Sequence, residues 1–252
     1  MVLDSFKLDG KVAIVTGARR GLGLGIAAGL AQAGADIFGV GTGDMAPCRK
    51  AVEAAGRRFA SIKADLVSLE PIGGIVDGCL EKFGKIDILV NNAGIVRRAD
   101  AVDYTESDWD DVININLKTI FFLTQRVGKL MIAQGGGKII NIASMLSYQG
   151  GIRVAPYTSS KSGLMGLTRL LANEWAKYNV NVNAIAPGYM NTDNTEALRA
   201  DPVRSAEILG RIPAGRWGDF DELAGTAVFL ASDASKYIHG FTVAVDGGWL
   251  AR

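Results

Sequence analysis

Apolar segments and amphipathic segments alternate along the whole chain. The apolar segments are short and rich in Val, Ile and Leu, which is typical of strands buried in a parallel sheet. They lie near residues 11–16, 35–40, 58–63, 86–91, 137–143, 180–186 and 241–245. Segments with helical periodicity separate them, near residues 21–33, 45–56, 68–83, 108–133, 157–178 and 220–231. This alternation predicts one α/β domain over residues 1–252, with a doubly wound, parallel seven-stranded sheet and helices on both faces.

One stretch, at about residues 188–217, lacks clean periodicity and contains Pro202 and Pro213. It follows a predicted strand directly. Long insertions beside such strands commonly cover a binding site. We therefore expect residues 188–217 to form a mobile helical lid over a substrate.

Composition narrows the range of functions. The chain has 252 residues, enough for one domain with a large core. Its net charge is +1 with acidic and basic residues interspersed, so the charge pattern predicts neither a nucleic-acid nor a membrane partner. No apolar run approaches the ~18 residues that span a bilayer, and the N-terminus does not have the layout of a signal peptide. Cys48 and Cys79 are expected to be free thiols in a reducing cytoplasm.

The chain contains a single histidine, His239. One His and two scattered Cys do not suffice for a Ser-His-Asp triad or a zinc site of the His/Cys type, and we expect no metal. Any catalysis therefore depends on residues such as Tyr, Lys, Ser and Asn.

A glycine-rich turn lies near the N-terminus, between the first predicted strand and the first predicted helix. Its sequence is Thr16-Gly-Ala-Arg-Arg-Gly-Leu-Gly23. In this context, glycines let the backbone approach a pyrophosphate closely, and free N–H groups at the helix start bind the anion. The alternative is a tight turn that uses glycine only for its positive φ. The residues predicted to contact a dinucleotide here are Gly17, Arg19, Arg20, Gly21, Leu22 and Gly23.

Two other predicted strands end in polar residues. Residues 86–91 run into Asn91-Asn-Ala-Gly94, and residues 137–143 run into Ser144. In an open α/β sheet, ligands bind beyond the carboxyl ends of the strands. Both groups should therefore reach the same edge of the sheet, although either could be a plain turn.

Tyr157 and Lys161 are four residues apart in a predicted helix and so share one face. A free tyrosine has a pKa of ~10 and is a poor acid–base catalyst at neutral pH. A nearby ammonium favours the phenolate and lowers that pKa. Thirteen residues upstream, Ser144 could donate a hydrogen bond to the same carbonyl oxygen.

In this order and spacing, the motifs resemble those of the short-chain dehydrogenase/reductase family, from Gly10 to Gly248. The resemblance implies a Rossmann-type domain and hydride transfer between a nicotinamide cofactor and a carbonyl or hydroxyl group. Tyr157 then corresponds to the acid–base tyrosine, and Lys161 to the lysine that lowers its pKa and binds the nicotinamide ribose. Ser144 corresponds to the serine that orients the carbonyl, and Asn116 to the asparagine that supports a proton-relay water.

The same resemblance assigns further cofactor contacts. Asp65, followed by Leu66, corresponds to the acidic residue beside the adenine ring. The remaining contacts implied are Asn91, Ala93, Gly94, Pro187, Gly188 and Thr192, besides Tyr157 and Lys161 themselves.

The nucleotide preference rests on two conflicting observations. Gly41 and Thr42 occupy the end of the second strand, where members that prefer NAD carry an acidic residue, so no carboxylate there repels a 2′-phosphate. Arg19 and Arg20 also lie where members that prefer NADP carry a basic residue. The enzymes that this chain resembles most closely mostly use NAD, so we expect NAD(P) with NAD slightly favoured.

Three arginines point to an acidic substrate. Arg97 and Arg98 follow the Asn-Asn-Ala-Gly turn, and Arg153 lies four residues before Tyr157. An arginine fork is the preferred partner of a carboxylate, although Arg97 and Arg98 could be solvated loop charges. Gln149 and Tyr189 would suit a polyhydroxylated ligand.

A closer resemblance is to the 2-dehydro-3-deoxy-D-gluconate 5-dehydrogenases and related uronate reductases. It is carried by residues 142–153, 172–177, 186–190 and 245–252. It implies a keto or hydroxy sugar acid as substrate, in uronate, pectin or alginate catabolism, and a homotetramer with Phe241–Val245 at a subunit interface. Two alternatives remain: a 3-oxoacyl carrier-protein reductase, and a non-catalytic dinucleotide-binding sensor.

Overall fold

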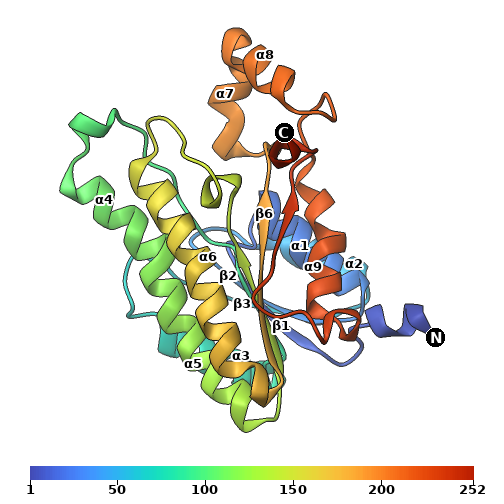
Figure 1. Ribbon diagram of the computed structural model, residues 1–252. Helices are drawn as coiled ribbons and strands as arrows, with labels where there is room; N and C mark the ends of the chain where they lie inside the picture. Colours follow the sequence, from blue (N-terminus) through green and yellow to red (C-terminus); the bar gives the residue numbers. More distant parts are fainter.

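Seven parallel strands form a single sheet in the computed structural model, which describes residues 1–252. The strands are β1 Val12–Thr16, β2 Asp36–Gly41, β3 Phe59–Lys63, β4 Ile88–Asn91, β5 Gly137–Ile142, β6 Val180–Pro187 and β7 Thr242–Val245. Their order across the sheet is β3-β2-β1-β4-β5-β6-β7, and every neighbouring pair is parallel (Figure 1). The predicted α/β fold and the predicted strand positions are confirmed.

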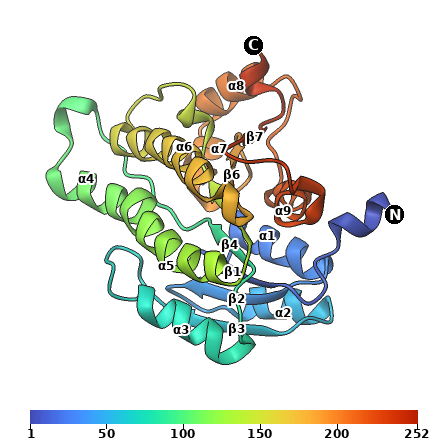
Figure 2. The same ribbon diagram turned by 60° about the horizontal axis from the view of Figure 1, so that its bottom comes forward.

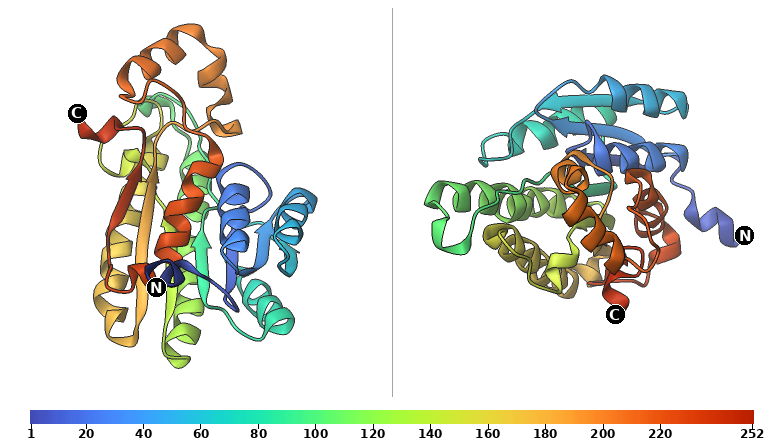
Figure 3. Two further views of the ribbon diagram at one scale, coloured as in Figure 1. Left: turned by 90° about the vertical axis from the view of Figure 1, so that its right-hand side faces the viewer. Right: turned by 90° about the horizontal axis from the view of Figure 1, so that it is seen from above.

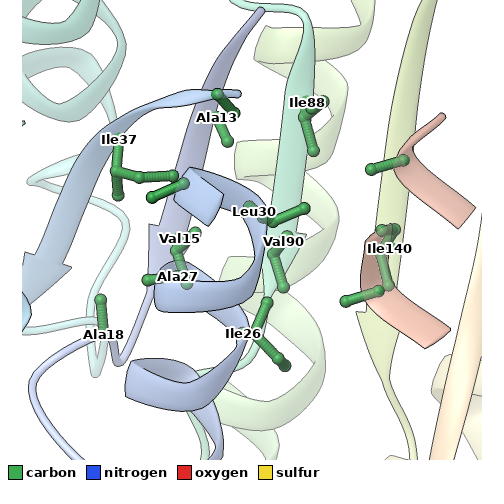
Figure 4. Close-up of a cluster of buried hydrophobic side chains, with 14 of the residues drawn as sticks. Ala13, Val15, Ala18, Ile26, Ala27, Leu30, Ile37, Ile88, Val90 and Ile140 are labelled. Atoms are coloured by element: carbon green, nitrogen blue, oxygen red, sulfur yellow. The ribbon is translucent and has the colours of Figure 1, made fainter. Parts of the chain in front are cut away.

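Helices cover both faces of this sheet (Figure 2). They are α1 Gly21–Gln32, α2 Ala46–Ala54, α3 Ile72–Phe83, α4 Glu106–Ile113, α5 Thr119–Ala133, α6 Ala155–Trp175, α7 Glu196–Ala200, α8 Pro202–Arg211 and α9 Ala224–Ala231. One core of 23 buried residues joins the sheet to α1, α2 and α9, as Ile26, Leu30 and Ile37 illustrate in Figure 4. A second core of 20 buried residues joins it to α3, α5 and α6. No helix is long and apolar enough to cross a membrane.

The structure divides the helix predicted at 108–133. A π-helical turn at Asn114–Lys118 separates α4 from α5. Within this turn Asn116 is completely buried and hydrogen-bonds to the backbone of Ile95, both accepting from its N–H and donating to its carbonyl. Helical periodicity cannot reveal such an interruption, because the apolar face continues through it. π-Turns occur frequently at functional sites.

Residues 188–217 project beyond the carboxyl edge of the sheet and contain the short helices α7 and α8 (Figure 3). The cluster that holds them has only four buried residues: Met145, Ile208, Ile212 and Trp249. Tyr189 packs edge-on against Trp217 and Trp249, with ring centroids 5.4 and 4.9 Å away. Apart from Met190, which belongs to the larger core, this segment is thus tied to the C-terminus by aromatic contacts.

Candidate active site

A cavity of about 370 Å³ opens at the carboxyl ends of the strands, beside the point where the strand order reverses between β1 and β4. This is where open α/β sheets bind ligands. Most of the residues predicted for the cofactor line it: Gly17, Arg19, Arg20, Gly21, Leu22, Gly23, Gly41, Thr42, Asp65, Leu66, Ala93, Gly94, Tyr157, Lys161, Pro187, Gly188 and Thr192. The fold therefore brings residues from six strand ends to one place.

The glycine loop is packed closely enough to require glycine. Gly17 has φ +67°, and a Cβ there would lie 2.8 Å from the side-chain nitrogen of Asn92. At the start of α1, Gly21 also has positive φ, and no side chain caps the helix. With no acidic residue in the first turn, the free N–H groups of α1 face the cavity edge unneutralised. This loop fits the pyrophosphate of a dinucleotide.

The side chain of Asn91 is not in the cavity, contrary to the expectation for this residue. It is 1% exposed and donates hydrogen bonds to Thr124 of α5 and Asn141 of β5. Asn92 lines the cavity instead, with its amide donating to the carbonyl of Thr16 at 2.9 Å. Because β4 is buried on both faces, its sequence gives no alternation that would tell which asparagine faces the ligand.

Arg19 lies across the end of β2. Its Nε and Nη1 atoms would be 3.2 Å from a Cβ placed on Gly43, so the guanidinium packs closely over this turn. No carboxylate lies within ion-pair distance of Arg19, whereas Arg20 pairs with Asp193. Arg19 is thus a cation without an ion-pair partner beside Gly41 and Thr42.

Tyr157, Lys161 and Ser144 meet at one wall of the cavity. The first turns of α6 carry Tyr157 and Lys161, and the Lys161 amine lies 5.7 Å from the centroid of the Tyr157 ring. Lys161 is 3% exposed and donates a 2.6 Å hydrogen bond to the carbonyl of Ile142, which fixes the amine at the end of β5. Ser144 lies two residues after that strand ends and caps a short 3₁₀ turn, where its hydroxyl accepts from the N–H of Leu146.

Burial dominates the protonation of this wall. Desolvation raises the pKa of Tyr157, while the Ser144 hydroxyl and the Arg98 charge act to lower it. Desolvation also lowers the pKa of Lys161 to about 8. The expected lowering of the Tyr157 pKa by Lys161 is therefore not found. Burial thus shifts both groups toward their neutral forms, yet at neutral pH the Tyr157 phenol keeps its proton and Lys161, with a pKa of about 8, still carries most of its charge.

Asn116 does not line the cavity but lies directly behind Gly94. A Cβ at Gly94 would be 3.1 Å from the Asn116 carbonyl oxygen and 3.7 Å from the Lys161 amine. Asn116 also donates to the hydroxyl of Ser160, one residue before Lys161. The asparagine thus connects the loop after β4 to the helix that carries Tyr157 and Lys161.

The predicted substrate residues differ in position. Ser144 lines the cavity, whereas Arg97, Arg98, Gln149, Arg153 and Tyr189 do not. Arg97 is paired with Asp108 and Asp111 on α4. Arg98 has no carboxylate partner, donates to the carbonyl of Asn194, and its charge reaches Tyr157.

Arg153 and Tyr189 are held by other contacts. Arg153 pairs with Asp100, and its backbone adopts φ +62°, which is uncommon for a residue other than glycine. Tyr189 is half-buried between Trp217 and Trp249. Neither arrangement could be read from sequence spacing.

Several residues of the cavity carry no signal in the sequence. Ile95, Ile115, Met190, Asp193, Asn194 and Thr195 all line the cavity. The last four come from the segment after β6. Its sequence has no periodicity or motif that would single them out, and only their proximity to Thr192 could have suggested them.

Comparisons with known proteins agree with this architecture. Residues 17–250 match the family model described as Enoyl-(Acyl carrier protein) reductase. The chain is 62% identical, over the full length of both, to the 2-dehydro-3-deoxy-D-gluconate 5-dehydrogenase of Escherichia coli.

Two solved structures are also similar. One is a candidate 2-deoxy-D-gluconate 3-dehydrogenase of Agrobacterium tumefaciens with bound NADP, at 50% identity and TM-score 0.91, covering 99% of this chain and 100% of that one. The other is a gluconate 5-dehydrogenase of Burkholderia cenocepacia in complex with NADP and tartrate, at 39% identity and TM-score 0.94, with both chains fully covered. With its motifs, its sheet order and these likenesses, the chain belongs to the short-chain dehydrogenase/reductase family.

Proposed function

We propose that this enzyme is an NAD(P)-dependent oxidoreductase that interconverts a ketone and an alcohol on a sugar acid of the 2-dehydro-3-deoxy-D-gluconate class. The observation that carries the proposal is the meeting of Ser144, Tyr157 and Lys161 in the cavity that also contains the glycine loop. The relative at 62% identity, which bears that activity in its name, supports the choice of substrate class. A non-catalytic sensor would not need all of these groups.

The catalytic roles follow from the positions of these side chains. A bound nicotinamide would supply or accept the hydride. Ser144 and Tyr157 hold the substrate oxygen, and Tyr157 donates its proton to that oxygen in the reduction direction. Because the pKa of Tyr157 is raised, the phenol is protonated at neutral pH and ready to act as an acid. The Lys161 ammonium stabilises the phenolate left behind, and Asn116 holds the Gly94 loop and α6 in register.

Arg98 is the best candidate for the substrate carboxylate. Its charge acts on Tyr157, and no acidic residue neutralises it. Arg97 is occupied by two aspartates, and Arg153 by one. We assign Arg98 the main role, with Arg153, Gln149 and Tyr189 completing a polar rim.

Residues 188–217 act as a lid in this proposal. Three contacts join them to the body beside the cavity: the Arg20–Asp193 ion pair, the Arg98 hydrogen bond to Asn194, and the Gly21–Thr192 approach. All three lie at the cavity mouth and involve exposed or half-buried groups. Contacts of this kind can open and close around a substrate at little energetic cost.

The nucleotide is NAD(P), and the position of Arg19 shifts our expectation from NAD toward NADP. The Arg19 guanidinium has no ion-pair partner and lies over the end of β2, where no carboxylate would repel a 2′-phosphate. The guanidinium of arginine is well suited to bind a phosphate group through two parallel hydrogen bonds. The expected result is a lower KM for NADPH than for NADH, with a clear loss of that difference in Arg19→Ala.

The proposal places the enzyme in a reducing cytoplasm. Cys48 and Cys79 are both buried, and burial raises the pKa of each thiol to about 12, so they stay reduced and unreactive in a cytoplasm.

β7 is an edge strand, and Phe241 beside it is 59% exposed. An exposed aromatic beside an open strand edge suits the interface of a homotetramer.

The decisive test is oxidation of NADPH and of NADH followed at 340 nm with three kinds of ketone. These are 2-dehydro-3-deoxy-D-gluconate-type keto acids, the matching neutral keto sugars, and a 3-oxoacyl thioester. Fast turnover of the keto acids supports the proposal. Turnover of the thioester alone would instead identify a 3-oxoacyl carrier-protein reductase.

A further inference from the structure

A second cavity, of about 660 Å³, lies at the opposite edge of the sheet from the active site. It is formed at the amino ends of the central strands, by Lys11 before β1, Asp87 before β4, Lys138 in β5 and Asn181 in β6. In Figure 1 this is the end of the molecule away from α7 and α8. Lys138 and Ser144 lie at opposite ends of β5, so the two cavities are roughly 20 Å apart.

The lining of this cavity is polar and basic. Only 3 of its 19 residues are hydrophobic. Five lysines line it, together with His239 and two aspartates: Lys7, Lys11, Lys85, Lys138, Lys236, Asp87 and Asp233. Its volume lies within the range of small-molecule sites. Counting His239 as neutral, the lining carries an excess of three positive charges.

The two aspartates of the lining do not neutralise all five of its lysines. Asp87 accepts from the N–H of Val12 and pairs with Lys85 and Lys11. Lys138 and Lys236 have no ion-pair partner, although the charge of Asp233 acts on Lys138.

Lys138 is the clearest sign of a ligand. It stands between Ile88 of β4 and Asn181 of β6, and its amine nitrogen is buried without any hydrogen-bond partner. The Nδ1 atom of His239, in the same cavity, is also buried and unpartnered. Buried polar groups in proteins are nearly always paired, because an unpaired one loses its hydration without compensation. Both groups must take a partner from outside the polypeptide, and in a cavity this basic an anion supplies one to the Lys138 ammonium.

The glycine backbone beside this cavity offers no free N–H group to an anion. The N–H groups of Gly135, Gly136 and Gly137 all donate within the protein, to Ile132, Met131 and Asn179. A ligand would therefore be held by side chains. Lysine binds phosphate and carboxylate as a compact point charge, so a cluster of lysines suits an anion with several charges.

We propose that this basic cavity binds a small, multiply charged oxyanion, either a polycarboxylate or a phosphate compound, with Lys138 as its central contact and Lys236 at its rim. This site is separate from the catalytic cavity and shares no residue with it. The nucleotide and substrate of the proposed reaction would not occupy it.

Titration calorimetry on the full-length protein tests the proposal, with citrate and pyrophosphate as probes at low ionic strength. Saturating NADPH is present so that the dinucleotide cavity does not contribute. We expect saturable binding at one site per chain. The probe that binds more tightly identifies a carboxylate or a phosphate site.

Three variants test whether the heat of binding measured by calorimetry comes from the basic cavity. Lys138→Met should weaken binding at least tenfold, and Lys236→Met, at an exposed residue whose loss spares the core, should weaken it severalfold. Lys50→Met, an exposed lysine of α2 outside the cavity, should leave binding unchanged. Absence of saturable binding of either probe overturns the proposal. So does equal weakening in all three variants, which would show only an effect of net charge. If Lys138→Met does not fold, the Lys236→Met variant decides: unchanged binding of the probe in that variant is enough to overturn the proposal.

Discussion

The catalytic wall and the lid are built very differently, although both border the same cavity. Ser144, Tyr157 and Lys161 rest on strands and a helix that belong to cores of 23 and 20 buried residues. Beyond Met190, which joins the larger core, the lid at 188–217 depends on a cluster of four. Its polar contacts, such as Arg204–Glu207 and Arg216–Glu222, are exposed ion pairs, which solvent and salt screen strongly.

This difference separates two tasks. Proton transfer needs side chains held to within a fraction of an ångström, which the large cores and the 2.6 Å bond from Lys161 to Ile142 supply. Substrate entry and recognition need a segment that can move without disturbing those side chains, and weak local contacts permit this. Changes in the wall should therefore alter turnover, while changes in the lid should alter affinity.

The largest effect is expected from removal of the Tyr157 hydroxyl. Tyr157→Phe deletes the proton donor while keeping the ring against Lys161, so kcat should fall by about 10²–10⁴-fold. Dinucleotide binding and the thermal midpoint should change little, because the glycine loop is untouched. Steady-state kinetics and nucleotide fluorescence titration measure the two quantities. Retention of more than a tenth of the activity would refute the role of Tyr157.

Arg98 and Arg97 offer a matched pair for the substrate carboxylate. Arg98→Gln should raise the KM of keto acids by about 10–100-fold, the equivalent of one charged hydrogen bond, and that of neutral ketones far less, through loss of the contact to Asn194. Arg97→Gln, which removes a surface arginine already paired with Asp108 and Asp111, should change KM by no more than about twofold. Measurement of KM for acid and neutral substrates with both variants decides the point. If the two variants behave alike, the assignment is wrong.

The sequence predicted the fold well because the fold depends on periodic burial. All seven strands and the main helices lie within a few residues of their predicted positions, since alternating apolar segments leave a regular pattern. The spacing of the glycines in the N-terminal turn and of Tyr157 and Lys161 likewise predicted where the cavity lies.

The features that the sequence did not reveal depend on contacts between distant residues. The side chain of Asn91 turns inward to Thr124 and Asn141, Arg97 is neutralised from α4, and burial outweighs Lys161 at Tyr157. Spacing along the chain holds no information about these partners. The hydrogen-bond and ion-pair partners of the polar residues around the site are therefore known only from the three-dimensional structure.

Trp249→Ala tests whether the lid can be loosened independently. Trp249 is 4% exposed and packs against Tyr189, with the guanidinium of Arg211 4.1 Å from its ring. Its removal should raise KM by about tenfold, or ~1.4 kcal/mol, with little change in kcat. Hydrogen exchange should accelerate in α7 and α8 while β1, β4 and β5 stay protected. Faster exchange throughout the sheet would mean that lid and wall are one cooperative unit.

The smallest effect is expected from pH, and it belongs to the wall alone. Lys161, whose pKa burial lowers to about 8, is charged below that pH and neutral above it. Tyr157, whose pKa is raised, keeps its proton over the same range. Reduction should therefore be constant below about pH 8 and decline above it, as the phenolate loses its stabilising ammonium. Because no titrating group of the lid is needed for this decline, Trp249→Ala should show the same midpoint in kcat. A midpoint that moves with the lid variant would break the separation between the two regions.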